Sequence, residues 1–203
     1  MFLANLDSFN RYRLMRKNLA IFASGAGSNA QKIIDYFKDS DKARVALILC
    51  NKPDAGVFSI ANQEGIESVL INKVEYKNDG YASFLINKGI DFVILAGFLL
   101  KIPTPLIEAF PQKIINIHPA LLPNYGGKGM YGSFVHEAVI KNKEPQSGIT
   151  IHYVDEHYDH GAVIFQATCD IAESDTPETL ATKIHQLEHR YFPKIIEEAL
   201  SLL

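Results

Sequence analysis

The chain has 203 residues, which fits one α/β domain, and its 47% hydrophobic and 21% charged content is that of an ordinary globular protein. A formal net charge of -3 gives no general attraction to nucleic acid or to an anionic membrane surface. The two cysteines, Cys50 and Cys169, stand far apart in apolar runs, which argues against a disulfide framework or a zinc site and favours a reducing compartment. No stretch is apolar for long enough to span a bilayer, so we expect a cytoplasmic protein.

The segment before the first apolar run has no long apolar stretch of its own, and its basic cluster at residues 11–17 follows polar residues. That order is unlike a secretory signal. Met15 is an alternative start codon. We therefore expect residues 1–17 to be a disordered or extra tail and residues 18–203 to form a single domain.

Short apolar runs alternate with helical patterns in the first part of the chain. The expected elements are strands at residues 19–23, 45–49, 68–71, 92–96 and 114–118, a helix through residues 33–37, helices at about 56–64 and 80–88, and a loop at 72–79. Such alternation predicts βαβ units and a mainly parallel sheet. Because the runs are continuously apolar, both faces of this sheet should be covered by helices.

The chain changes character after Pro119. The expected elements there are a Gly/Pro-rich loop at 121–129, a helix at 132–142, strands at 148–154 and 163–167 around a polar loop at 155–161, and a capped helix from Thr176 to about Leu200. We expect Pro193 to interrupt the last helix. The predicted fold class is α/β, a mostly parallel, open, twisted, Rossmann-like sheet with helices on both faces and an antiparallel C-terminal strand.

Two polar side chains end the strand at residues 114–118. Asn116 and His118 are two positions apart, so they point to the same side of the strand, and Pro119 ends the ladder. Open α/β sheets bind ligands at this carboxyl edge. An amide and an imidazole aimed at one point suit a carbonyl oxygen that gains negative charge. The alternative is a polar strand end with a hydrogen-bonded histidine.

A glycine-rich turn follows the first strand. Residues 25–30 have the pattern G-x-G-x-x-A between a strand and a helix, which is the setting of a phosphate-binding turn, and Ser28 and Asn29 add side-chain donors. A dinucleotide site would need an acidic residue after the second strand, where residues 50–52 read Cys-Asn-Lys. We predict a phosphate site without a dinucleotide. A tight turn that binds nothing is the alternative.

The loop at residues 155–161 is dense in Asp, His and Tyr. Its Asp159 would raise the pKa of His118, and could accept a proton, if the two side chains met in the fold. Most acids in loops only cap turns, and spacing alone does not bring Asp159 to His118.

Two histidine pairs have spacings that a metal site would allow. They are His157-x-x-His160, near Asp155 and Asp159, and His185-x-x-x-His189. The second pair lacks the glutamate position of H-E-x-x-H. We expect no metal.

Taken together, these motifs resemble one family in order along residues 18–200. The segments that carry the likeness are Ala23-Ser24-Gly25-Ala26-Gly27-Ser28-Asn29, Leu95-Ala96-Gly97-Phe98, Asn116-Ile117-His118-Pro119-Ala120-Leu121-Leu122-Pro123, Gly148-Ile149-Thr150-Ile151-His152 and Asp159. In these segments the chain resembles phosphoribosylglycinamide formyltransferases, which transfer a formyl group from 10-formyltetrahydrofolate to the amine of glycinamide ribonucleotide in purine synthesis and have a mostly parallel sheet covered on both faces.

The resemblance implies a role for each matching residue. Asn116 and His118 would stabilise the oxyanion of a tetrahedral intermediate, and Asp159 would raise the pKa of His118 and help to move the proton of the amine. The residues expected to bind substrates are Gly27, Ser28 and Asn29 at the 5′-phosphate, Glu188 on the glycinamide side, and Leu99, Leu100, Lys101 and Ile102 around the folate pteridine, with the backbone of residues 155–159 closing that pocket.

The chain departs from the family pattern mainly on the folate side. Many members have Arg where Leu100 stands, and the basic residue that helps to bind the folate has no clear match, which leaves Lys73 or Lys77. The loop at residues 126–132 differs from the commonest version, and His160 replaces a commoner Gly.

Two other formyl-transfer enzymes share this kind of site. Methionyl-tRNA formyltransferase carries an extra C-terminal RNA-binding domain, and formyltetrahydrofolate hydrolase carries an extra N-terminal regulatory domain. We expect neither domain here, and hence small-molecule substrates, no nucleic acid, no membrane, and a monomer or weak homodimer. A phosphate-binding module in which His118 is structural is the alternative from another class.

Overall fold

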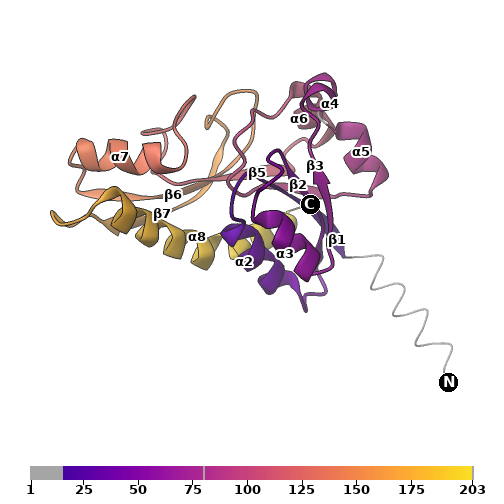
Figure 1. Ribbon diagram of the computed structural model, residues 1–203, viewed down its shortest axis with the longest axis horizontal. Helices are drawn as coiled ribbons and strands as arrows, with labels where there is room; N and C mark the ends of the chain where they lie inside the picture. Colours follow the sequence, from indigo (N-terminus) through magenta and orange to yellow (C-terminus); the bar gives the residue numbers. More distant parts are fainter. Residues whose placement is uncertain (1–15, 80, 203) are drawn as a thin grey trace.

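The computed structural model describes residues 16–79 and 81–202 of the chain (Figure 1). Most of the tail expected at residues 1–17 lies outside the described residues. The first strand begins at Lys17, where Lys17 and Asn18 pair with Ala43 and Arg44 of the neighbouring strand. The strand is therefore two residues longer at its start than the apolar run at 19–23.

One seven-stranded sheet organises the fold. Its spatial order is β3-β2-β1-β4-β5-β6-β7. The strands are β1 (Lys17–Ala23), β2 (Ala43–Cys50), β3 (Glu67–Leu70), β4 (Phe92–Leu95), β5 (Ile114–His118), β6 (Gln146–Tyr153) and β7 (Val163–Asp170). The first five are parallel, whereas β6 runs antiparallel to β5 and β7 antiparallel to β6. The predicted fold class is confirmed.

Helices cover both faces of this sheet (Figure 1). They are α2 (Ser28–Phe37), α3 (Val57–Gln63), α4 (Lys73–Asn78), α5 (Ala82–Asn87), α6 (Thr104–Ala109), α7 (Ser133–Lys141) and α8 (Pro177–Leu200). Buried side chains of α2, α3, α7 and α8 belong to one core, and those of α4, α5 and α6 to a second core. Strand β1 contributes side chains to both cores, because Leu19 and Ile21 face the first core and Ala20 and Phe22 face the second.

The prediction of a loop at residues 72–79 is wrong, since α4 lies there. Asn72 caps this helix by accepting a hydrogen bond from the Val74 amide at 2.9 Å. The ring of Tyr76 packs in the second core, and its hydroxyl donates to the Lys101 carbonyl at 3.1 Å. Burial of one tyrosine and a helix cap thus outweigh the polar composition of the stretch.

Two further differences concern prolines. No helix was expected at residues 104–109, yet α6 forms there with Pro105 in its first turn and Leu106 fully buried. The interruption predicted at Pro193 is wrong, because α8 is one continuous helix of 24 residues. Phe192 and Ile196 are completely buried on either side of that proline, so core packing holds the helix through it.

The topology reverses between β1 and β4. From β1 the chain moves outward through β2 to β3, and it then returns to place β4 on the other side of β1. Ligand clefts of open α/β sheets form at the carboxyl ends of strands where the order reverses in this way. Among the described residues, no helix is both long and apolar enough for a membrane crossing.

Candidate active site

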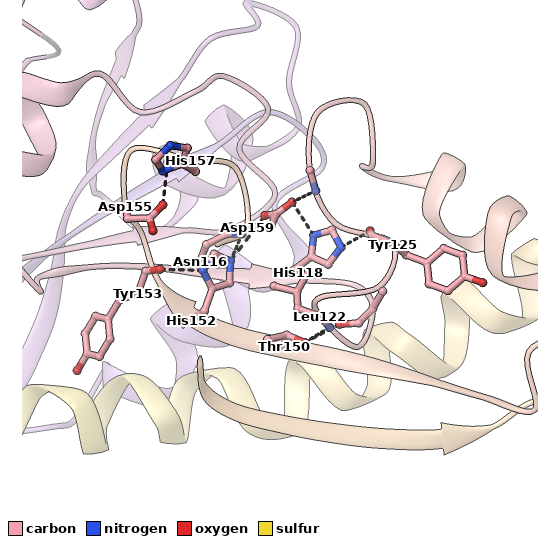
Figure 2. Close-up of polar contacts among 12 residues, drawn as sticks. Asn116, His118, Leu122, Tyr125, Thr150, His152, Tyr153, Asp155, His157 and Asp159 are labelled. Carbon is pink, nitrogen blue, oxygen red and sulfur yellow. Dashed lines mark hydrogen bonds and ion pairs between the residues drawn. The ribbon is translucent and has the colours of Figure 1, made fainter. Parts of the chain in front are cut away.

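Strand β5 presents Asn116 and His118 to one cavity, which both side chains line. The Asn116 amide donates to Nε2 of His152 at 3.1 Å, and Nδ1 of His152 donates to the Tyr153 carbonyl at 2.8 Å. Nε2 of His118 donates to the Tyr125 carbonyl at 2.7 Å. Figure 2 shows both rings held in these contacts. The hydrogen bonds fix the orientation of each ring and the position of its proton.

Asp159 lies between the two histidines (Figure 2). Its Oδ2 is 3.6 Å from Nδ1 of His118, and its Oδ1 is 3.7 Å from Nε2 of His152. The Gly127 amide donates to Oδ2 at 2.8 Å, and Asp159 has a left-handed backbone with φ 57°. The polar loop after β6 therefore brings its acid to the tip of β5.

The charges of this pair follow from burial and from each other. Burial lowers the pKa of His118 below its ordinary value, although the Asp159 carboxylate acts in the opposite direction. Burial works to raise the pKa of Asp159, but His152, His118 and the Gly127 amide together lower it. The acid has the expected influence on His118, and burial outweighs it. At neutral pH the pair is a carboxylate beside a neutral imidazole whose Nδ1 faces it.

The glycine-rich turn forms the start of α2. Gly27 is the N-cap of α2 with φ 85°, and no side chain caps this helix. The amides of the first turn are consequently free to bind an anion, helped by the positive end of the helix dipole. Ser28 and Asn29 line the same cavity as His118. The strand–turn–helix setting of the G-x-G-x-x-A pattern is present, and the phosphate site at this turn stays a prediction.

Glu188 of α8 closes this end of the cavity. It is only 5% exposed, and its Oε2 accepts hydrogen bonds at 2.9 Å from Nδ2 of Asn29 and from Nδ1 of His185. Three helices therefore supply one polar wall, because α7 also contributes Ser133 and His136 to the lining.

The cavity has a volume of about 750 Å³ and contains both ends of the site. A smaller pocket of about 70 Å³ adjoins it and shares four lining residues with it, Phe98, Asn116, Tyr158 and Asp159. The smaller pocket is lined by Leu100, Lys101 and Ile102 and by residues of the 154–159 loop. Leu99 faces the larger cavity. The two pockets meet beside the polar group at the end of β5.

Comparison with known proteins agrees with this geometry. The formyl transferase model matches residues 17–196, nearly the whole chain. The chain belongs to the formyl transferase family. It is 42% identical to the chloroplastic phosphoribosylglycinamide formyltransferase of Arabidopsis thaliana over 188 residues, which cover 89% of this chain and 64% of that protein. With the Bacillus subtilis phosphoribosylglycinamide formyltransferase it shares 37% identity over 92% of this chain and 96% of that one.

A solved structure shows the same fold. The phosphoribosylglycinamide formyltransferase of Bacillus halodurans is 38% identical and superposes with a TM-score of 0.83, covering 91% of this chain and 96% of its own. This formyl transferase chain spans only about 60% of the length of the two plant relatives, 64% for Arabidopsis thaliana and 60% for Vigna unguiculata.

Sequence reasoning missed the neighbours that hold this formyl transferase site in place. In the register of β5 and β6, His152 lies opposite Asn116 and Thr150 lies opposite His118. Thr150 accepts from the Leu122 amide at 3.0 Å and donates to the Ala120 carbonyl at 2.7 Å, which anchors the chain after β5. Two polar residues at i and i+2 in an otherwise apolar strand were the available signal.

Ser24 is a second such neighbour, and it is buried at the end of β1. Its hydroxyl donates to Oδ1 of Asn51 at 2.5 Å and accepts from the Leu99 amide at 3.0 Å. It thereby ties the segment after β4 to the start of the glycine-rich turn. No periodic pattern in the sequence marks this contact.

The two lysines considered for the folate lie apart from both pockets, and the histidine pairs do not form a metal site among the described residues. Neither Lys73 nor Lys77 of α4 lines either one. Among residues 16–79 and 81–202 no group of three or more His, Cys, Asp or Glu side chains is arranged to hold a metal ion. The rings of His157 and His160 have centroids 5.9 Å apart, and those of His185 and His189 stack at 6.2 Å.

Proposed function

We propose that this formyl transferase chain transfers the formyl group of 10-formyltetrahydrofolate to the amine of glycinamide ribonucleotide, a step of purine synthesis. One observation carries the proposal. A free helix N-terminus suited to phosphate and an Asn–His–Asp group suited to acyl transfer line a single cavity. The relatives named phosphoribosylglycinamide formyltransferase support it.

The reaction needs little besides orientation, charge stabilisation and one proton transfer. The amine of the ribonucleotide attacks the formyl carbon, a C–N bond forms, and the formyl oxygen becomes an oxyanion. The bond from that carbon to the folate nitrogen then breaks, the oxyanion returns to a carbonyl, and the proton lost by the amine ends on the folate nitrogen. Holding both reactants in one cavity makes this encounter effectively unimolecular.

Asn116 and His118 are proposed to stabilise the oxyanion. Asn116 uses one of its two amide hydrogens toward His152, and the other remains for substrate. Nε2 of His118 now donates to the Tyr125 carbonyl, so the substrate oxygen must replace this carbonyl as its acceptor. Asp159 beside Nδ1 favours the doubly protonated ring and is the proposed carrier of the amine proton.

The folate is proposed to occupy the pocket beside Leu99, Leu100, Lys101 and Ile102. That pocket holds about 70 Å³, well below the ~300 Å³ at which ligand pockets begin, so the 154–159 loop must open to admit a ring. The residue that contacts the folate glutamate stays a prediction, with Lys73 and Lys77 as candidates.

The test is to mix the protein with glycinamide ribonucleotide and 10-formyltetrahydrofolate and to follow the deformylated folate by absorbance. The proposal expects deformylation that requires the ribonucleotide, with one formylated ribonucleotide formed per folate. Loss of formyl without the ribonucleotide would instead indicate a hydrolase. No loss at all would indicate a binding module and contradict the proposal.

Compartment and assembly belong to the same proposal. We infer a cytoplasmic enzyme acting on small molecules as a monomer or weak homodimer, without nucleic acid or membrane. The two plant relatives are named as chloroplastic, so fractionation of cells expressing the full chain is the test of the compartment. Sedimentation of the protein across a range of concentrations tests the assembly.

A further inference from the structure

His136 is a buried histidine of the large cavity that the proposed reaction does not use. It belongs to α7, is 5% exposed and lines the cavity with Ser133 of the same helix. Its Nδ1 is buried and has no partner among the described residues. Nε2 makes no hydrogen bond in the described part of the chain, but unlike Nδ1 it is not fully buried. It is therefore the ring nitrogen that reaches the cavity.

The ring of His136 lies within electrostatic reach of both ends of the site. The charges that act on it are those of His185 and Glu188 at the phosphate end and of His118 at the reacting end. The helix that carries it packs against α8, which supplies His185 and Glu188. His136 therefore lines the same cavity as the glycine-rich turn and His118, where a ligand that spans the two can contact it.

The charge of His136 indicates which kind of ligand group it would bind. Burial lowers its pKa first, and the charge of His185 lowers it further, while Glu188 acts against them. The imidazole is accordingly neutral at neutral pH. A neutral ring offers a dianionic phosphate little charge, whereas a hydroxyl can either accept from Nε2–H or donate to a bare Nε2.

We propose that His136 binds a ribose hydroxyl of the ribonucleotide and so sets the position of the sugar between the anchored phosphate and the reacting amine. The inference rests on the proposed function, since the ribonucleotide is its ligand. A hydrogen bond from one hydroxyl to His136 would discriminate against the deoxyribose that lacks that hydroxyl.

The experiment compares His136→Ala and His136→Gln with the parent protein on glycinamide ribonucleotide and on its 2′-deoxy and 3′-deoxy analogues. Loss of one neutral hydrogen bond should raise KM for the parent ribonucleotide by ~3- to 10-fold in His136→Ala with little change in kcat. The increase should vanish on one of the two analogues, because the partner hydroxyl is already missing. His136→Gln, which keeps a donor, should lose less.

Val139→Ala provides the matched control for folding. Val139 lies one turn further along α7, is also buried and lines neither pocket. It should lower the melting temperature without changing KM on any substrate. An unchanged KM in His136→Ala, or an equal increase on all three substrates, would overturn the inference.

Calorimetric titration of the ribonucleotide and its analogues, with no folate present, separates the two proposals. If the parent protein binds the ribonucleotide but forms no product, the proposed transfer fails while the sugar contact is still measured. If the parent protein is active and His136→Ala binds all three ligands as the parent does, the contact fails while the transfer stands. A parent protein that does not bind the ribonucleotide contradicts both.

Discussion

Two imidazole–carboxylate pairs stand at opposite ends of one cavity, and they differ in almost every physical respect. His118 is buried and Asp159 is partly buried, and their closest nitrogen and oxygen are 3.6 Å apart. His185 and Glu188 meet at 2.9 Å, and the imidazole side chain is 55% exposed. The pKa of His118 is lowered by its burial, whereas the pKa of His185 is raised by its hydrogen bond to Glu188.

Burial dominates the pKa of His118, whose acid is 3.6 Å away, whereas the 2.9 Å hydrogen bond to Glu188 dominates the pKa of the more exposed His185. At the reacting end the ring stays neutral next to a carboxylate, so it is ready to gain a proton when charge develops nearby. At the phosphate end the hydrogen bond to Glu188 raises the pKa of the His185 ring, close to the proposed site for an anion. One cavity thus combines the end proposed to handle a proton with the end proposed to bind an anion.

The largest expected effect comes from breaking the reacting pair. His118→Ala or Asn116→Ala should lower kcat by about 10²–10³, the cost of one oxyanion donor in comparable acyl chemistry. Asp159→Asn should also lower kcat, because it removes the charge that favours protonation of His118. Binding of the ribonucleotide should change little, as measured by calorimetry. Normal turnover in any of these variants would contradict the assigned roles.

Features of the site that follow from local sequence patterns could be predicted, whereas contacts between distant segments could not. The strand tip at Asn116 and His118 follows from period and position, and the predicted sheet and turn of residues 25–30 are present in the fold. The approach of Asp159 does not follow, because a loop that returns across β6 has no local signature. The partners Ser24 and Tyr125 also have no local signature, since each acts through a tertiary hydrogen bond, whereas the i, i+2 spacing of Thr150 and His152 was a signal.

The second prediction tests whether the backbone conformation of the glycine-rich turn requires a glycine at position 27. A Cβ on Gly27 would meet Val57 and Ile60 of α3 at 2.9 Å, and its φ of 85° disfavours any side chain. Gly27→Ala should therefore destabilise the fold by about 1–3 kcal/mol. Gly25→Ala is the matched control, because its Cβ would meet nothing within 4 Å. Urea unfolding of both variants makes the measurement, and equal stabilities would contradict it.

The third prediction concerns Tyr76 of α4, which contacts two residues that line the proposed folate pocket, Phe98 and Lys101. Tyr76 packs edge-on against Phe98 with centroids 5.9 Å apart and donates its hydroxyl to the Lys101 carbonyl. Tyr76→Phe keeps the ring and removes one hydrogen bond, which should cost about 1 kcal/mol of stability. KM for the folate should rise slightly, while KM for the ribonucleotide stays constant. A change confined to the ribonucleotide would show that α4 serves the other end.

The smallest expected effect concerns folding stability: as pH falls, His185 should stabilise the fold and His118 should destabilise it. His185 has a folded pKa above its unfolded value of about 6.5, so its stabilisation is complete below that value and is lost as pH rises through the folded pKa. Glu188, His189 and His136 face it, and its half-exposed position limits the gain to about 0.2–1 kcal/mol. His185→Gln should accordingly cost stability at pH 5.5 and almost none at pH 8.5.

His118 should behave in the opposite way. Its folded pKa lies below about 6.5, so the unfolded chain takes up the proton first and His118 destabilises the fold as pH falls through that value. The groups that face it are Asp159, His152, Glu188 and the Tyr125 carbonyl, and the two acids reduce the penalty without reversing it. The stability of His118→Gln relative to the parent should therefore improve between pH 8.5 and pH 5.5 in urea unfolding. If both glutamine variants shifted in the same direction, burial would not be what separates the two ends of the cavity.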